Sequence, residues 1–403
     1  MAHTQRDVIL LFTARSIRLF AYGALSVVLA LYLHEAGLTG ATIGLLFTLT
    51  LAGDAGVSLW ITTTADRVGR KRMLLLGAGL MVMAGLVFGM TGNIILLVIA
   101  GVVGVISPSG NEIGPFLSLE QAALSQLLPS EQRTKAFAWY NLAGSLAAAG
   151  GALAGGLLSQ GLKHTGYADL DSYRAVIFGY AACGLLLIAL FLFLSPEVEA
   201  AATIAEKERV LGLHRSRGIV MKLSALFALD AFAGGFVIQS MVAYWFHIKF
   251  GLDAGVLGSI FFGANLLAGV SALLAVPLAN RIGLINTMVF THIPSNVLLC
   301  LVPFMPSAGL AVVVLLLRFS ISQMDVPTRQ SYTMAVVAPD ERSAASGVTS
   351  IARSLGAAIS PSLTGVLLTS PALVGAPFLV AGGLKIAYDL LLYRSFSRTD
   401  ARS

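Results

Sequence analysis

The feature that most constrains this chain is a series of apolar runs, each about 20 residues long, that recurs along its whole length. A helix of that length crosses the ~30 Å hydrocarbon core of a bilayer. Hydrophobic residues make up 57% of the 403-residue sequence and charged residues only 11%. This composition excludes a soluble protein of the same length. We therefore predict an all-α integral membrane protein.

The apolar runs predict twelve transmembrane helices. They cover residues 8–33, 41–64, 73–91, 94–127, 135–160, 173–195, 219–248, 255–278, 285–305, 309–337, 343–369 and 374–394. Residues 196–218 are polar, and we interpret them as a cytoplasmic linker. The prediction thus divides the chain into an N-terminal six-helix bundle (1–195), the linker, and a C-terminal six-helix bundle with a short tail (219–403).

The most charged turn, Asp66-Arg67-Val68-Gly69-Arg70-Lys71-Arg72, lies between the second and third predicted helices. A run this basic does not enter hydrocarbon, and basic loops stay on the cytoplasmic side. The loops on the opposite side hold only Lys163, Arg174 and Lys249. An even number of helices places both termini on one side. We expect both termini to be cytoplasmic and the protein to lie in the cell inner (plasma) membrane.

The two halves of the sequence repeat one another. With a shift of 214 residues, Gly37 falls on Gly251 and Arg67-Val68-Gly69 falls on Arg281-Ile282-Gly283. With a shift of 209, Gln121 falls on Gln330 and Arg133 on Arg342. Internal repeats of this kind are typical of transporters built from two bundles. We predict two pseudo-symmetric bundles of the same hand.

The turn, the twelve helices and the repeat together resemble the major facilitator superfamily, whose signature loop has the pattern Asp-Arg-x-Gly-Arg-Lys-x-x-Leu. The resemblance implies a transporter in which two bundles rock about a central site. It implies that Asp66 caps the start of helix 11 and pairs with nearby arginines, among which Arg133 matches the helix 4–5 turn. The predicted cytoplasmic gate motif is Asp66, Arg67, Gly69, Arg70, Lys71 and Arg133. In the second half, Asn280 replaces the Asp.

The run Gly150-Gly151-Ala152-Leu153-Ala154-Gly155-Gly156 in helix 5 resembles the glycine-rich motif of antiporters in that family. Ala152 replaces the proline of that motif. Small residues at this spacing also simply allow two helices to pack closely.

Charged side chains inside the predicted helices mark candidate functional positions, because each costs about 2.5–3.5 kcal/mol at mid-membrane. Most of them lie in helices 1, 4, 7 and 10, which line the central cavity in the family. The predicted substrate and proton pathway is Arg15, Arg18, Tyr22, Asn111, Glu112, Glu120, Asp230, Gln239, Gln323, Asp325 and Arg329.

Glu112 is the candidate for proton exchange, with Asp230 or Glu120 assisting. It follows Pro108-Ser109-Gly110 and precedes Gly114-Pro115, so the helix is expected to break around it. Free backbone groups within a membrane are tolerated only where they line a cavity or are buried in protein.

Other charges have simpler interpretations. The 209-residue shift places Glu120 on Arg329, which suggests a gate pair, although structural ion pairs would explain the same residues. Lys385 and Asp389 are four residues apart and are interpreted as a mutually neutralising structural pair. His292 lies on a peripheral helix without an acidic partner at helical spacing, and we assign it no role.

We predict a secondary active transporter that exports a small organic solute or drug in exchange for protons. The alternative is a symporter or facilitator for an anionic metabolite, with Arg15, Arg18 and Arg329 as ligands. No nucleophile–base set, phosphate loop or metal-ligand spacing is present, so we expect no enzyme, no catalytic residue, no metal and no cofactor other than the coupling proton. A receptor would need an additional soluble module.

The expected partners are a small-molecule substrate and the lipid bilayer. Nucleic acid is not expected, because the basic residues fall in short loops that set topology. We expect a monomer, since the transport pathway needs no second copy.

Overall fold

The computed structural model describes residues 2–110, 116–199, 215–338 and 341–397. Its internal contacts divide the chain into two compact units. Unit 1 consists of Met1–Ile204 with Gln239–Phe262, and unit 2 consists of Ala205–Ile238 with Gly263–Ser403. The contacts thus group residues 239–262 with the first unit. The sequence-based division into bundles of residues 1–195 and 219–403 stays a prediction.

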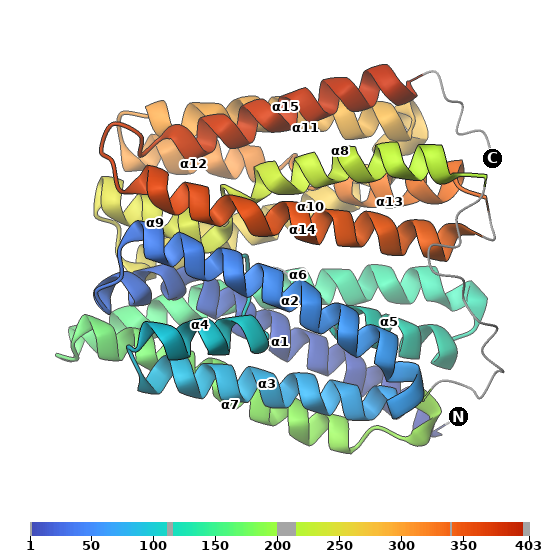
Figure 1. Ribbon diagram of the computed structural model, residues 1–403, viewed down its shortest axis with the longest axis horizontal. Coiled ribbons are helices and arrows are strands. Elements are labelled where there is room, and N and C mark those ends of the chain that lie inside the picture. Colours follow the sequence, from blue (N-terminus) through green and yellow to red (C-terminus); the bar gives the residue numbers. More distant parts are fainter. Residues whose placement is uncertain (1, 111–115, 200–214, 339–340, 398–403) are drawn as a thin grey trace. The chain divides into compact units, whose positions relative to one another are not determined.

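The described part of unit 1 is helical. Its elements are α1 (Ala2–Glu35), α2 (Gly40–Val68), α3 (Arg70–Met90), α4 (Ile94–Val103), α5 (Phe116–Leu127), α6 (Ser130–His164), α7 (Asp169–Leu192), the short 3₁₀ turn Pro196–Val198, α9 (Gln239–Phe250) and the start of α10 (Ala254–Ile282). Helix α1 packs along α6 and α7, and α3 packs along α7 (Figure 1). The middle of α1 is the core of the unit, because Val27 to Ala30 are completely buried.

Unit 2 is built in the same way. Its elements are α8 (Arg217–Gly235), the rest of α10, α11 (Leu284–Leu301), the 3₁₀ turn Val302–Phe304, α12 (Ala308–Phe319), α13 (Asp325–Val336), α14 (Arg342–Leu368) and α15 (Ala376–Phe396). Helix α8 packs on α14 and α15, and α11 packs on α15. Phe227, Met288, Tyr332 and Tyr388 form a buried cluster at these contacts.

The predicted fold class is confirmed. Ten described segments are long and apolar enough to cross a bilayer. The two remaining predicted spans are each represented by a short apolar helix, α4 or α12, with α5 or α13 following it.

Three predicted spans are broken helices. Span 94–127 is interrupted between α4 and α5, as expected around Glu112, although residues 111–115 lie outside the described part of the chain. Spans 219–248 and 309–337 were wrongly predicted as continuous. The first breaks after Gly234-Gly235, where two poor helix formers meet. The second breaks before Pro327, whose ring clashes with a helical carbonyl four residues earlier.

The predicted repeat is visible in the helix boundaries. A shift of 214 residues carries α2 onto α10 from first residue to last, and a shift of 209 does the same for α5 and α13. The turns agree as well, since Gly69 and Gly283 have φ of 111° and 85°. Only glycine adopts this backbone region without strain. The two Arg-x-Gly turns therefore have the same local structure.

Candidate functional site

Unit 1 buries a complete ion pair between α1 and α5. Arg18 donates from Nη1 and Nη2 to the two oxygens of Glu120, both at 2.8 Å. The hydroxyl of Tyr140 on α6 also donates to Glu120. Both charged side chains are completely buried. Two-point pairing of a guanidinium with a carboxylate is the strongest geometry for such a pair, so three helices are joined at this carboxylate.

Arg15 lies next to this pair but has different contacts. Its guanidinium donates to Oδ1 of Asn141 at 3.2 Å and stacks over the Tyr140 ring at 4.2 Å. Tyr22, one turn further along α1, is buried with its ring 6.2 Å from that of Tyr180. The predicted grouping of Arg15, Arg18 and Tyr22 along α1 thus connects α1 to α5, α6 and α7.

Unit 2 buries a larger cluster, centred on Asp230 of α8. Lys385 on α15 donates to Oδ1 of Asp230 at 2.5 Å, and Arg329 on α13 donates to Oδ2 at 3.0 Å. Arg329 also contacts Asp325, one turn earlier on α13, at 3.1 Å. All four side chains are buried. Each oxygen of Asp230 therefore has its own cationic partner.

The sequence-based interpretation of Lys385 and Asp389 is wrong. Lys385 pairs with Asp230 on another helix, and Asp389 accepts a hydrogen bond from Nδ1 of His292 at 2.9 Å. Asn296 donates to the other oxygen of Asp389 at 3.1 Å. His292 therefore has an acidic partner that spacing along its own helix does not reveal. The detectable signal was the presence of two charges in the middle of the apolar helix α15.

The two clusters have opposite polarity at equivalent positions. Glu120 and Arg329 are equivalent under the 209-residue repeat. The partner of Glu120 is the base Arg18 on α1, whereas the partner of Arg329 is the acid Asp230 on α8. Both members of the suggested Glu120–Arg329 gate pair have their partners inside their own unit. The pairing that the structure shows is α1 with α5, and α8 with α13.

The charged turn at residues 66–72 binds the segment that follows α7. The carboxylate of Glu199 accepts hydrogen bonds from the backbone N–H groups of Arg70 at 2.6 Å and Lys71 at 3.3 Å, at the start of α3. Lys71 Nζ donates to the carbonyls of Leu192 and Leu194 at the end of α7. An anion at a helix N-terminus and a cation at a C-terminus both complement the helix dipole. The turn therefore holds together the start of α3, the end of α7 and the segment that follows α7.

Other members of the predicted gate motif have local contacts. Arg70 also donates to Oε1 of Gln126 on α5 at 3.0 Å, and Arg133 donates to the carbonyl of Leu128 at 3.1 Å. Arg67 is exposed. The side chain of Asp66 lies outside the described part of the chain, so its cap on helix 11 and its pairing with Arg133 stay predictions.

Ser26 of α1 binds the start of α9, which in turn binds the segment after α4. Gln239, the first residue of α9, donates from Nε2 to Ser26 Oγ at 2.8 Å, and Ser240 donates from Oγ to the Ser26 carbonyl at 2.8 Å. The Ser240 N–H donates to the carbonyl of Pro108, in the segment after α4. The predicted pathway residues Asn111 and Glu112 follow this segment but lie outside the described residues. The break in helix 4 and the start of α9 are thus held at one point of α1.

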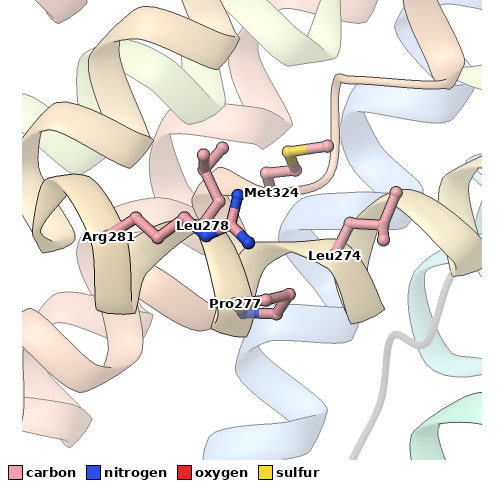
Figure 2. Close-up of a pocket in the computed structure, with 5 residues that line it drawn as sticks. All are labelled: Leu274, Pro277, Leu278, Arg281 and Met324. Carbon is pink, nitrogen blue, oxygen red and sulfur yellow. The ribbon is translucent and has the colours of Figure 1, made fainter.

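Gln323, the remaining predicted pathway residue, lies in the break between α12 and α13, where its backbone N–H donates to Ser271 Oγ at 3.3 Å. A pocket of about 310 Å³ lies nearby in unit 2. Figure 2 shows that it is lined along α10 by Leu274, Pro277, Leu278 and Arg281, and closed by Met324. The pocket is almost entirely apolar and contains no predicted pathway residue, so we do not assign it to transport.

The glycine-rich run of α6 lies at two close helix crossings within unit 1. A Cβ added at Gly155 would lie 2.8 Å from the Ala24 backbone of α1, and one added at Gly156 would lie 2.9 Å from the Cα of Gly258 on α10. Close packing therefore accounts for these small residues, whatever they contribute to transport.

Repeated sets of membrane-spanning helices define the class of two-bundle membrane transporters. In this chain, ion pairs are buried between α1 and α5 and between α8 and α13. A profile described as Major Facilitator Superfamily matches residues 11–361. The chain belongs to this superfamily. It is an integral membrane protein and a secondary transporter, not an enzyme.

Among curated proteins, the chain is 30% identical over 428 residues to the "Uncharacterized membrane protein YJR124C" of Saccharomyces cerevisiae, with 98% of this chain and 95% of the relative covered. It is 28% identical over 272 residues to the "Multidrug resistance protein MdtG" of Citrobacter koseri, with 63% of this chain and 61% of the relative covered.

Solved structures with the same fold include the nucleoside transporter NupG, with a TM-score of 0.74, 14% identity and coverage of 99% and 100% of the two chains. The D-xylose-proton symporter has a TM-score of 0.75, 16% identity and coverage of 98% and 99%. At these identities the likeness is one of fold.

Proposed function

We propose that the protein exports a small organic solute or drug in exchange for protons. The observation that supports this most is that two buried arginines of the lining helices, Arg18 and Arg329, are already bound to carboxylates. Arg18 is held by Glu120, and Arg329 is held by Asp230 and Asp325. Such arginines are not presented to an anionic substrate. The alternative of an anionic metabolite bound by Arg15, Arg18 and Arg329 would require these pairs to open first.

The same pairs offer a way to couple protons to helix contacts. A proton that adds to Glu120 or Asp230 cancels the negative charge that pairs with the neighbouring cation. Removing one partner of a buried pair costs about 3–5 kcal/mol. Protonation of these carboxylates would therefore loosen the contact between their helices. Glu112 remains the proposed primary proton site, on the basis of the helix break in residues 104–110 just before it, and Asp230 or Glu120 would assist.

Export is the proposed direction for two reasons. The glycine-rich run of α6 is similar to the motif of antiporters, with Ala152 in place of proline. Relatives at 28% identity carry the name "Multidrug resistance protein MdtG". Protons moving inward down their gradient would drive such export.

The test uses purified protein in liposomes that enclose a pH-sensitive dye, with an imposed proton gradient and pools of metabolites and drugs. We expect one pool to dissipate the gradient, and Glu112→Gln to abolish this while exchange of labelled substrate continues. Glu35→Gln, at the exposed end of α1, is the matched control and should behave like the wild type. Full proton-driven transport in Glu112→Gln would show that the assignment is wrong. Equilibration of labelled compounds without proton movement would indicate a uniporter or another coupling ion.

We also propose that both termini are cytoplasmic and that the protein lies in the plasma membrane as a monomer. The concentration of basic residues in the loops on the side of the 66–72 turn supports this orientation. A green fluorescent protein fused to the C-terminus should fluoresce, because it folds on the cytoplasmic side; a dark fusion that is nevertheless expressed would reverse the orientation.

A further inference from the structure

Two groups of buried polar side chains lie along α15 in unit 2, one reaching the peripheral helix α11 and the other reaching α13. His292 contacts Asp389, Lys385 contacts Asp230, and Asp230 contacts Arg329. Asp389 and Lys385 are one helical turn apart on α15, so the two groups are neighbours along that helix. The pair His292–Asp389 plays no part in the proposed proton exchange at Glu112.

Lys385 contacts one acid and shares a helix face with a second. Its ammonium group lies 2.5 Å from Asp230 Oδ1. Asp389 is four residues further along the same helix, on the same face, where oppositely charged side chains interact. Asp230 also has Arg329 at 3.0 Å, so it stays neutralised by one cation if Lys385 turns away. Lys385 can therefore change partner without leaving the Asp230 carboxylate alone.

The attraction between Lys385 and Asp389 depends on His292. When the imidazole is neutral, its Nδ1–H donates to Asp389 and the pair carries one negative charge. When a proton adds to Nε2, the pair becomes an imidazolium–carboxylate pair with no net charge. Imidazole is the side chain whose ordinary titration falls between about pH 5 and 8. The charge that Lys385 meets on its own helix therefore changes within that range.

Several other charged or titratable groups interact with Asp389 or with Asp230. Asp230 from α8 and Lys385 act on Asp389 directly, together with His292. Tyr388 is its neighbour on α15. Arg329 from α13 and Arg353 from α14 act on Asp230, and Asp325 contacts Arg329. Of these side-chain types, only imidazole ordinarily titrates near neutral pH.

We propose that His292 and Asp389 form a proton-binding site that controls whether Lys385 belongs to Asp230 alone or is shared with Asp389. With the proton bound, Lys385 stays on Asp230, as in this structure. With the proton released, Asp389 draws Lys385, and Asp230 depends on Arg329. The covalent bond that forms or breaks is the Nε2–H bond of His292, and one ammonium group changes partner. The inference goes beyond the proposed export, since it gives α11 and α15 a role in setting the charge around Asp230.

The test is a set of double-mutant cycles on the full-length protein in nanodiscs, without substrate, read as shifts in thermal unfolding at pH 5.5 and 8.5. The cycle of Lys385→Gln with Asp389→Asn should show coupling at pH 8.5 that falls at pH 5.5. The cycle of Lys385→Gln with Asp230→Asn should show the reverse. In a His292→Gln background both couplings should become independent of pH. His247→Gln, whose ring contacts the Leu252 carbonyl in unit 1, is the control and should leave both pH dependences intact.

Couplings that are equal at the two pH values, or a pH dependence that survives in His292→Gln, would overturn the proposal. If Asp230→Asn does not fold, NMR of ¹³C-histidine-labelled wild type gives the same answer. The resonance missing from His292→Gln should change between pH 5.5 and 8.5, and its absence of change would also overturn the proposal. Because no substrate is used, either failure is distinct from a failure of the export proposal.

Discussion

Single residues show how this chain keeps charges inside apolar helices. Arg18 balances the charge of Glu120, and Arg329 with Lys385 balances the charges of Asp230 and Asp325. A buried charge that loses its partner is far more costly than a pair that is complete. The clusters therefore stabilise one arrangement of helices within each unit, and any transport step that opens them must supply a replacement partner.

The Glu120 cluster gives a prediction for stability. Glu120→Gln should lower the free energy of unfolding by about 3–5 kcal/mol, because it removes the carboxylate that pairs with both Nη groups of the buried Arg18. Tyr140→Phe removes one hydrogen-bond donor and should cost only about 1 kcal/mol. Chemical denaturation in detergent micelles measures both values. Replacing Arg18 and Glu120 together by Met should recover most of the loss, and equal losses in Glu120→Gln and Tyr140→Phe would contradict this explanation.

The residues of these clusters differ in how well the sequence reveals them. Arg18, Glu120, Asp230 and Arg329 stand out because charges in apolar runs are rare and costly. Lys385 was misinterpreted because a partner at helical spacing, Asp389, lies on its own helix. The pairing observed in the structure depends on how α15 is rotated toward α8, which spacing along one helix does not contain.

Helices in this protein are organised by close crossings and by breaks. Helix α1 is continuous over 34 residues, whereas its repeat partner is divided into α8 and α9. The glycines of α6 allow it to approach α1 until backbone meets backbone, as at Gly155 and Ala24. The repeat therefore preserves helix boundaries while the two halves differ in where a helix is interrupted.

Two adjacent glycines of α6 give a matched test of this packing. A Cβ at Gly151 would overlap the Phe20 carbonyl of α1, whereas a Cβ at Gly150 meets nothing within 4 Å. Gly151→Ala should destabilise by about 1–3 kcal/mol, because the helices must separate. Gly150→Ala should stabilise by up to about 1 kcal/mol, because alanine is the better helix former. Thermal unfolding of the two variants checks this; equal effects would mean that α1 and α6 are not in backbone contact.

At the scale of the whole molecule, the chain does not fill its two units in simple sequence order. Residues 239–262 follow α8 of unit 2, yet they pack within unit 1. Gln239 and Ser240 bind Ser26, and Gly258 lies against Ala152 and Gly156. The second half of the chain therefore contributes structure to the first unit.

Cleavage of the intact protein tests this arrangement. A protease site inserted between residues 204 and 205 should give fragments that still elute together in mild detergent. Gly258→Leu should separate most of them, because its side chain would collide with the Ala152 carbonyl, 2.6 Å from a Cβ at this position. Gly263→Leu, on the same helix but with Leu316 of unit 2 at 3.4 Å, is the control. Equal elution of the two variants would show that the Gly258 crossing does not hold the fragments together.

The sequence by itself determined the class of protein, the internal repeat and the positions of the buried charges Arg15, Arg18, Glu120, Asp230, Asp325 and Arg329. These properties follow from local quantities, since hydropathy over about 20 residues identifies a span and a charge within it is visible directly. The tertiary structure alone decided which charges pair, that the helices break after Gly235 and before Asp325, and that residues 239–262 join unit 1. Those outcomes depend on the rotation and depth of each helix, which are set by packing against all of its neighbours.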